Sequence, residues 1–230
     1  MSPIESNLQH TRFQINTAIA VLPLTQQKPV TLVAVSKTKS ADDIREAFAA
    51  EQRDFGENYV QEAVRKIEAL ADLRKPGIVW HFIGPLQSNK LKLIAAHFDW
   101  VEGIEHLKAA TALSRYRTGL TPLNVCVQVN ISAETSKSGV APEDALELAA
   151  QVMQLPWLKL RGLMAIIEDS NDEAKQRTQF RKMRTLFESM KMDGMDVDTL
   201  SMGMSQDFSI AIAEGATMVR IGSAIFGARE

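Results

Sequence analysis

Short apolar runs alternate along the chain with longer stretches in which apolar residues recur at helical spacing. The runs are rich in Val, Ile, Leu and Phe and lie at 32–36, 53–56 (the weakest), 79–84, 99–104, 123–131, 159–167, 199–202 and 217–221. The helical stretches between them lie at 41–51, 59–73, 89–97, 105–116, 142–153, 172–190 and 207–214. This alternation is typical of repeated βα units around a parallel sheet.

Two of the predicted helices have distinctive features. In the stretch 172–190, one face carries four apolar residues spaced three and four apart, namely Phe180, Met183, Phe187 and Met190. Ahead of the first strand, Ser2-Pro3-Ile4-Glu5 has the pattern of a capping box with proline at the first helical position. We therefore expect an additional helix before strand one.

Eight strand–helix units can close into a (β/α)8 barrel or open into a doubly wound sheet. The units are regular in length and lack large inserts, which favours closure. No Gly-x-Gly-x-x-Gly motif follows a predicted strand, so the dinucleotide-binding form of the open sheet has no support. We predict an α/β protein with a single (β/α)8 TIM barrel domain over residues 1–230 and an additional N-terminal helix.

Composition narrows the function classes. The formal charge is −2, from 26 Lys and Arg against 28 Asp and Glu, so the basic excess expected of a nucleic-acid binder is missing. The single cysteine, Cys126, excludes an intramolecular disulfide and a cysteine-rich zinc site. The scattered His10, His97 and His106 have no ligand spacing, so we expect no metal. Without a signal peptide or an apolar membrane segment, we expect a cytoplasmic protein with no membrane contact.

In a parallel barrel, functional residues lie at the carboxyl ends of the strands. Lys37 follows directly after the first apolar run. A lysine at the end of an inner strand loses hydration, which favours the free amine that attacks carbonyl groups. Lys37 is therefore a candidate to form a Schiff base. The alternative is that Lys37 begins a solvated loop, as we expect of Lys39.

Glycines and serines follow the seventh and eighth apolar runs. In barrels, the loops after these strands commonly form a phosphate site from backbone N–H groups and hydroxyls. Gly203 and Gly222 permit close backbone approach, and Ser205 and Ser223 supply donors. Each glycine is also compatible with an ordinary turn and each serine with a helix cap. Their occurrence together at these two strand ends favours an anion site.

Arg220 lies between Val219 and Ile221 in an apolar run. A charged side chain on a core strand needs an acceptor or a ligand, and a structural ion pair is the alternative to a ligand. A lysine on strand one, an arginine on strand eight and an anion site between them suit pyridoxal 5′-phosphate (PLP). This cofactor presents an aldehyde, a phosphate and a ring nitrogen.

Other strand ends carry Asn58, His81 and Asn130. His81 lies in an apolar run, which is more typical of a core histidine with satisfied hydrogen bonds than of a catalyst. These three residues are weaker candidates for the site.

Six segments resemble a known family: AVSKT at 34–38, FGENYVQE at 55–62, WHFIGPLQSNK at 80–90, GLM at 162–164, SMGMS at 201–205 and VRIG at 219–222. They occur in order from strand one to strand eight. The whole chain thereby resembles the pyridoxal phosphate homeostasis proteins, single barrels related to the N-terminal barrel of alanine racemases. The resemblance implies PLP as the cofactor.

The resemblance places the cofactor-bearing lysine at Lys37 and the arginine that faces the pyridine nitrogen at Arg220. It places the phosphate ligands at Ser205, Gly222 and Ser223. The remaining members of the implied site are Ser201 and Gly203 in the strand-seven motif, and Asn58, His81 and Asn130 in the wall. The roles of three other lysines stay open, namely Lys39, Lys90 and Lys137.

The resemblance also bears on turnover. Alanine racemases need a tyrosine from a second domain, which we do not expect here, and a histidine at the position of Ile166. Arginine has only donors and stays charged, so Arg220 would leave the ring nitrogen unprotonated and weaken carbanion stabilisation. We therefore expect a monomeric PLP carrier that contributes to PLP and amino-acid homeostasis without turnover. PLP-dependent apoenzymes are candidate partners.

Two other functions stay open. An amino-acid racemase-like PLP enzyme would use Lys37 as its base and exchange the α-hydrogen of an amino acid. A Schiff-base aldolase acting on a phosphorylated sugar would use the same lysine and phosphate site, but it would be colourless as purified.

Overall fold

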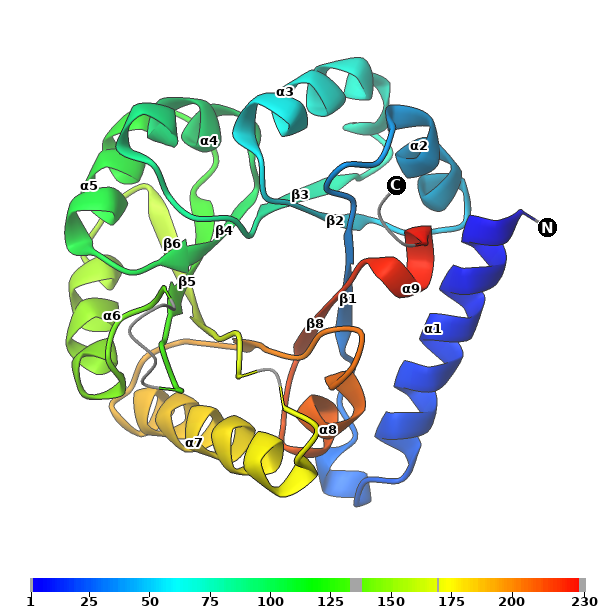
Figure 1. Ribbon diagram of the computed structural model, residues 1–230. Coiled ribbons are helices and arrows are strands. Elements are labelled where there is room, and N and C mark those ends of the chain that lie inside the picture. Colours follow the sequence, from blue (N-terminus) through cyan, green and yellow to red (C-terminus); the bar gives the residue numbers. More distant parts are fainter. Residues whose placement is uncertain (1, 133–137, 169, 228–230) are drawn as a thin grey trace.

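The computed structural model describes residues 2–132, 138–168 and 170–227. Within these ranges, eight parallel strands pair in chain order and β8 pairs with β1, which closes a barrel (Figure 1). The strands are β1 (Thr31–Val35), β2 (Asp54–Glu57), β3 (Val79–Phe82), β4 (Trp100–Ile104), β5 (Leu123–Gln128), β6 (Leu158–Met164), β7 (Thr199–Ser201) and β8 (Met218–Ile221). The predicted (β/α)8 barrel is confirmed.

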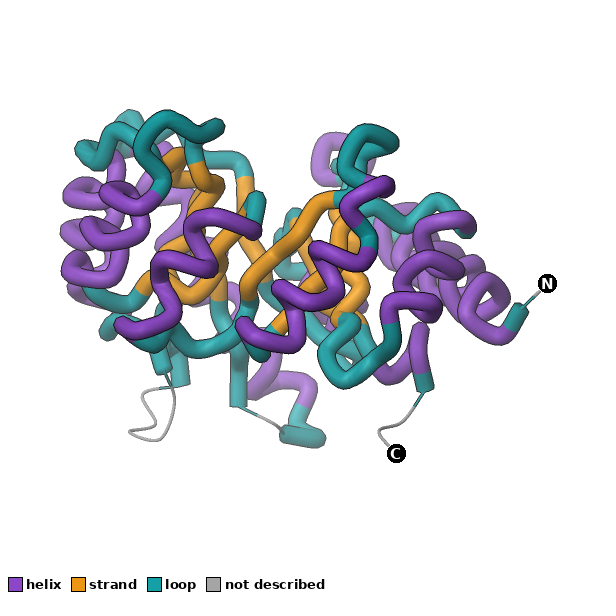
Figure 2. Tube along the Cα trace, turned by 90° about the horizontal axis from the view of Figure 1, so that it is seen from above, coloured by secondary structure: helices purple, strands orange, loops and turns teal. Residues whose placement is uncertain are grey.

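Helices surround the strands on the outside (Figure 2). They are α1 (Pro3–Ala20), α2 (Ala41–Ala49), α3 (Val60–Ala69), α4 (Leu91–His97), α5 (Leu107–Tyr116), α6 (Ala145–Met153), α7 (Glu173–Met192), α8 (Phe208–Ala213) and α9 (Ser223–Phe226). The described ranges also contain four 3-10 turns, namely η1 (Leu24–Gln26), η2 (Ala71–Leu73), η3 (Ser88–Lys90) and η4 (Pro142–Asp144). No helix in the described ranges is long and apolar enough to cross a membrane.

The predicted N-terminal helix is α1, which lies alongside α2, α8 and α9 (Figure 1). Ser2 caps it by accepting the N–H of Glu5 at 3.2 Å, and the Ser2 hydroxyl donates to Glu46 of α2. The side-chain amide of Asn7 donates to the carbonyl oxygen of Ile225 in α9 at 2.9 Å. Helix α1 therefore packs against the elements that flank β1 and β8.

The predicted apolar face of α7 is buried: Phe180, Met183, Phe187 and Met190 are each at most 3% exposed. Strand β5 ends at Gln128, before its apolar run ends, although the N–H of Val129 still donates to the carbonyl oxygen of Met164 in β6 at 2.9 Å. The N–H of Val140 donates to the carbonyl oxygen of Gln128, and the N–H of Asn130 donates to that of Val140, both at 2.9 Å. These bonds end the strand before Ile131.

Alternate side chains of each strand point to opposite faces of the barrel wall. On β1, Leu32 and Ala34 join the large apolar core beneath the helices, whereas Val33 points into the barrel. Val33 packs there with Trp100, Cys126, Met164 and Met218, which come from four other strands. The interior thus holds a small apolar cluster of its own.

A polar chain shares the interior with this cluster. The Glu102 carboxylate joins its two halves, because Oε1 lies 2.9 Å from Nδ1 of His81 and Oε2 accepts the hydroxyl of Ser201 at 2.6 Å. The hydroxyl oxygen of Ser201 accepts from Nη1 of Arg220 at 2.6 Å. The other ring nitrogen of His81 lies 3.0 Å from Oδ1 of Asp54. Hydrogen bonds therefore run without a break from Asp54 to Arg220.

The polar chain shifts the ionisation of its members. Burial alone would lower the pKa of His81, but the hydrogen bonds and charges of Asp54 and Glu102 outweigh burial and raise the pKa to about 9. Burial alone would raise the pKa of Glu102, but His81, Arg220 and Ser201 hold that pKa below its usual value. His81 and Glu102 therefore form a buried ion pair at neutral pH.

The His81 pKa predicts a pH dependence of stability. Since the folded pKa of about 9 lies above the ordinary value of 6.5, the stabilisation is complete below about pH 6.5 and is lost as the pH rises through about 9. We expect the free energy of unfolding to fall by about 3 kcal/mol across this interval. Urea unfolding at several pH values measures this change, and His81→Gln should remove that part of the slope.

A titration of the His81 imidazole by nuclear magnetic resonance gives an independent readout on the unaltered chain. A midpoint near the ordinary value of 6.5, or parallel stability curves for the parent and His81→Gln, would contradict the ion pair.

Candidate functional site

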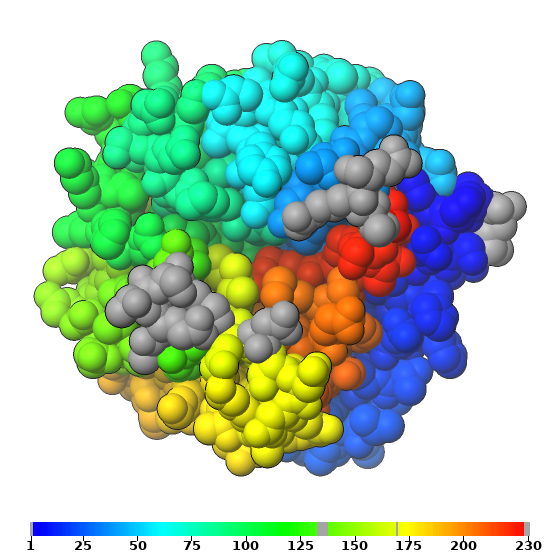
Figure 3. Space-filling model, viewed as in Figure 1, coloured from blue at the N-terminus to red at the C-terminus, as the bar shows by residue number. Residues whose placement is uncertain are grey.

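The predicted site residues lie at or near the carboxyl ends of the strands, at the end of the barrel that faces the viewer in Figures 1 and 3. In Figure 3, the orange and red surface of residues 200–227 borders the centre of this end. We call this end of the barrel, which carries Lys37, Ser205 and Ser223, the mouth. Its residues come from loops and strand ends that are distant in the chain.

The register of β1 and β8 places Lys37 and Arg220 on neighbouring strands. Val33 of β1 and Met218 of β8 both point into the barrel. Lys37 comes four residues after Val33, and Arg220 comes two residues after Met218. Val33 is also the pairing partner of Arg220. Strand β1 ends at Val35 and Lys37 lies in the turn that follows, so Lys37 lies at the mouth, and Arg220, level with Val33, lies below it. The bond of Arg220 to Ser201 and its approach to Glu102 place the guanidinium inside the barrel.

The backbone before Lys37 is anchored from outside the barrel wall. Nζ of Lys66, on α3, donates to the carbonyl oxygen of Ser36 and to Oε1 of Glu57, at 2.8 Å each. The Ser36 hydroxyl donates to the same carboxylate oxygen at 2.7 Å. Burial raises the pKa of Glu57 above its usual value, although Lys66 and Ser36 act in the opposite direction. A buried ion pair therefore fixes the end of β1.

The backbone after Lys37 is held by the same group of charges. Glu62 accepts the ammonium of Lys66 at 2.5 Å and the N–H of Thr38 at 2.6 Å. Thr38 has a φ of +66°, a conformation that is unfavourable for a β-branched residue. The Glu62 contact stabilises this turn. Lys37 is thus presented by a backbone that is fixed on both sides.

Arg220 uses only part of its donor capacity inside the barrel. Besides its bond to Ser201, Nη2 donates to the carbonyl oxygen of Ala165 at 2.8 Å, and Nη1 lies 3.8 Å from Oε2 of Glu102. Burial lowers the pKa of Arg220, and the charge of Glu102 opposes that effect. The ion pair that the sequence left open as an alternative is present. A guanidinium has five N–H donors, so donors are left for a further acceptor.

The two predicted phosphate serines face each other. The Ser223 hydroxyl, at the start of α9, lies 3.4 Å from the Ser205 hydroxyl oxygen after β7. Both hydroxyls are at least partly exposed at the mouth. The two loops therefore bring together two groups that can donate to one anion.

The two glycines of these loops are required by packing within the protein. A Cβ at Gly203, which has a φ of +98°, would lie 2.6 Å from Cβ of Ala211. A Cβ at Gly222 would lie 3.0 Å from the carbonyl oxygen of Val35. The sequence suggested that the backbone at these glycines lies close to a neighbour. The neighbour is α8 for Gly203 and β1 for Gly222, so packing within the protein explains both glycines without a ligand.

The three weaker candidates differ in position. Oδ1 of Asn58, just after β2, is buried and has no hydrogen-bond partner in the described part of the chain. Asn130, after β5, accepts the Ser132 hydroxyl at 3.3 Å. His81 lies deeper in the barrel, stacked on Trp100 with ring centroids 5.2 Å apart, and both of its ring nitrogens face carboxylates. His81 therefore has the contacts of a core histidine.

Sequence reasoning missed two acidic residues that organise the site. Glu102 interrupts an apolar run between Val101 and Gly103, and the argument that singled out Arg220 applies to it equally. Glu57 falls in a recognised motif, but its contact with Lys66 gives no signal in the sequence. Lys137, one of the lysines left open, lies outside the described residues.

Within residues 2–132, 138–168 and 170–227, no group of three or more His, Cys, Asp or Glu side chains is placed to hold a metal ion. The acidic groups near His81 are used in the polar chain, where they satisfy its ring nitrogens.

Comparison with known proteins gives consistent matches over the whole chain. The family described as "Alanine racemase, N-terminal domain" matches residues 11–230. The pyridoxal phosphate homeostasis protein of Pseudomonas aeruginosa is 53% identical over 231 residues, covering 100% of this chain and 97% of the relative. The protein of the same name from Escherichia coli K12 is 50% identical, covering 100% of this chain and 98% of the relative.

A solved structure agrees with these sequence matches. PipY of Synechococcus elongatus PCC7942, described with PLP bound, is 36% identical and superposes with a TM-score of 0.82 over 97% of this chain and 100% of PipY. Full-length identity of this order, together with the closed barrel, establishes the relationship. The chain therefore belongs to the pyridoxal phosphate homeostasis protein family, whose barrel is that of the alanine racemase N-terminal domain.

Proposed function

We propose that this chain is a single-domain PLP-binding protein that holds PLP at the mouth as a Schiff base on Lys37. The observation that carries the proposal is the placement of Lys37 and Arg220 on the adjacent strands β1 and β8, with two facing serine hydroxyls beyond β7 and β8. The relative PipY, which is described with PLP bound, supports the choice of cofactor.

The residues at the mouth fit the chemical groups of PLP. PLP supplies an aldehyde that bonds reversibly to an amine, and Lys37 is the amine at the end of β1. Ser205 and Ser223 can both donate to the phosphate. The unused donors of Arg220 suit the ring nitrogen, and the unpartnered Oδ1 of Asn58 leaves a buried polar atom at the edge of the site. The aldehyde, the phosphate and the ring nitrogen of PLP therefore each have a candidate residue at this end of the barrel.

The charges of the site favour the binding of PLP over the catalytic turnover of amino acids. Arg220 stays cationic because Ser201, Ala165 and Glu102 bind its guanidinium, so it can donate to a ring nitrogen but cannot accept a proton from it. Ile166, at the position where a racemase has a histidine, supplies no acid or base, and its side chain is exposed. The chain thus acts in PLP and amino-acid homeostasis, with PLP-dependent apoenzymes as the recipients of the cofactor.

The first prediction concerns the attachment site. Protein incubated with PLP should absorb visible light, and borohydride should fix a pyridoxyl group on the peptide that contains Lys37. Lys37→Ala should lose most of the adduct, whereas the matched variant Lys39→Ala should keep it. Peptide mass mapping decides between the lysines, and an adduct located mainly on Lys39, Lys90 or Lys137 would show that the assignment is wrong.

The second prediction concerns the phosphate. Ser205→Ala and Ser223→Ala each remove a hydrogen bond to a charged group, which costs roughly 1.5–3 kcal/mol, so PLP should bind about 10- to 100-fold more weakly. Phosphate-free pyridoxal should be affected much less. Ser209→Ala, an exposed serine on α8, is the control. Gly222→Val is a poor probe because its Cβ would press on Val35.

Fluorescence titrations with both ligands measure these affinities. Equal losses for pyridoxal and PLP would mean that the two serines do not contact the phosphate.

The third prediction concerns turnover. Racemisation needs a base on each face of the α-carbon, and positioned acid–base groups contribute roughly 10²- to 10⁴-fold each. With PLP and L- or D-alanine in deuterium oxide, we expect α-deuterium incorporation scarcely faster than free PLP gives. Proton magnetic resonance follows the exchange. Rapid exchange that disappears in Lys37→Ala would favour the racemase-like alternative.

A further inference from the structure

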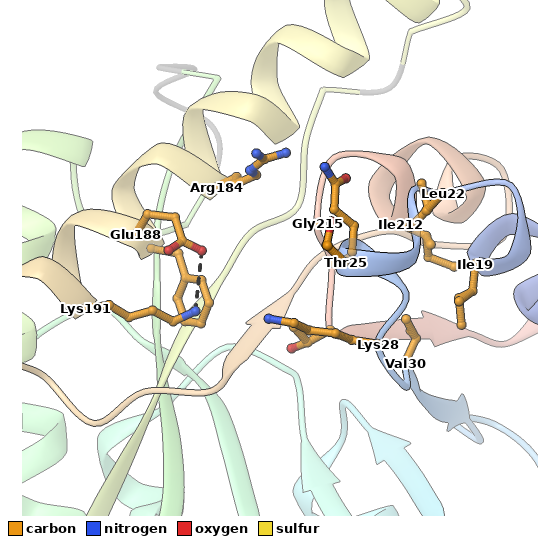
Figure 4. A pocket seen from close by; sticks show the side chains of 14 residues that line it. Ile19, Leu22, Thr25, Lys28, Val30, Arg184, Glu188, Lys191, Ile212 and Gly215 are labelled. Atoms are coloured by element: carbon orange, nitrogen blue, oxygen red, sulfur yellow. Dashed lines mark hydrogen bonds and ion pairs between the residues drawn. The ribbon is translucent and has the colours of Figure 1, made fainter.

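A cavity of about 180 Å³ lies at the end of the barrel opposite the mouth. It is enclosed by the end of α1, the segment 25–30 that leads into β1, the second half of α7, and the segment 215–217 that leads into β8 (Figure 4). The cavity therefore borders the first residues of β1 and β8. Lys37 and Gly222, in contrast, come after the last residues of these two strands. We call it the basal cavity.

The basal cavity is strongly cationic for this chain. Lys28, Arg184 and Lys191 line it, and Glu188 is the one carboxylate among its described lining residues. Glu188 pairs with Lys191 at 3.4 Å. In Figure 4, the ammonium groups of Lys28 and Lys191 point toward each other across the hollow. Three cations and one anion give a local charge of +2 in a protein whose formal charge is −2.

Arg184 stands out from the other arginines. Of the twelve arginines in the described ranges, eleven donate a hydrogen bond to a carboxylate, a carbonyl or a side-chain oxygen. Arg184 has no such bond within the residues that the structure describes. Its side chain is exposed and its stem passes over Gly215, where an added Cβ would lie 3.1 Å from the Cδ of Arg184. A guanidinium whose donors make no hydrogen bond to the protein is available to an external anion.

The floor of the basal cavity is apolar. Ile19, Leu22 and Val30 line the cavity and are partly exposed, whereas Phe187 and Ile212 lie deeper, at 3% and 2% exposed. The ammonium of Lys191 lies 4.2 Å from the centroid of the Phe187 ring. An inorganic anion would use only the cations. A ligand with both an anionic group and an apolar body would use the cations and the floor.

We propose that the basal cavity binds a small organic anion. Arg184 and Lys28 take its phosphate or carboxylate group, since both groups accept paired N–H donors. The partly exposed Ile19, Leu22 and Val30 take its apolar body. This site is separate from the mouth and does not depend on the binding of PLP there.

The test uses the full chain, both as purified and after loading with PLP and borohydride reduction, so that an occupied mouth cannot take up the probe. The probes are phenyl phosphate, benzoate, inorganic phosphate and the uncharged benzyl alcohol. Amide chemical shifts locate binding and titration gives the affinities. We expect saturable shifts around 184–191 and 212–217 with phenyl phosphate or benzoate, and whichever binds more tightly identifies the preferred anionic group. We expect benzyl alcohol to bind much more weakly.

Arg184→Gln and Lys28→Gln should each weaken binding by about tenfold or more, as expected for the loss of a charge-assisted hydrogen bond. Arg65→Gln, an exposed arginine on α3, makes the same change in net charge and should change the affinity by less than about twofold. The proposal is overturned if no organic anion gives saturable shifts at 184–191, or if all three variants weaken binding equally. Shifts confined to the mouth would also overturn it.

Discussion

The Glu102 carboxylate is the interaction on which the barrel interior depends. It is fully buried, and it is the counter-charge shared by His81 on one side and Arg220 on the other. Removing water from a charge costs several kcal/mol unless hydrogen bonds and an opposite charge replace the lost hydration. Glu102 offsets the burial of the Arg220 charge, and together with Asp54 it keeps His81 in the charged form. The polar chain therefore fixes where Arg220 lies, with some of its donors left for a further acceptor.

A second buried ion pair acts on the other side of the barrel wall. Lys66 and Glu57 lie between β2 and α3, outside the strands, and they hold the end of β1 through the carbonyl and hydroxyl groups of Ser36. Arg220 is thus positioned from inside the wall, and the turn that carries Lys37 is positioned from outside it. This double anchoring suits a protein that keeps a ligand in one place, because the residues that meet the ligand are set by rigid neighbours.

The two ends of β1 and β8 carry different chemistry. The mouth has an amine, hydroxyls and an arginine, whereas the basal cavity has cations over an apolar floor. The strands between the two ends are joined by backbone hydrogen bonds, including the bond from the N–H of Thr31 to the carbonyl oxygen of Thr217 at 2.9 Å. The same two strands therefore carry one candidate binding site at each end, the mouth and the basal cavity.

The alternating pattern predicted the barrel, because eight short apolar runs alternate with seven helical stretches, and a capping box predicted the N-terminal helix. It also singled out Lys37 and Arg220, since a charge at or within a buried run is conspicuous in the sequence alone. The ends of the elements were less certain. Strand β5 stops at Gln128 although the apolar run continues, because Val140, which is distant in sequence, takes over the hydrogen bonding.

What the sequence alone determined, then, was the order of the elements and the presence of charged residues at or within the apolar runs of strands one and eight. Only the tertiary structure decided which charges meet. Glu102 contacts His81 and Ser201 because closure of the barrel brings β3, β4 and β7 around one axis, and no local pattern encodes that distance. The packing roles of Gly203 and Gly222 likewise depend on neighbours that are supplied by other parts of the chain. Periodicity can be seen in residues that are close in sequence, whereas side-chain contacts across the barrel depend on how the strands close.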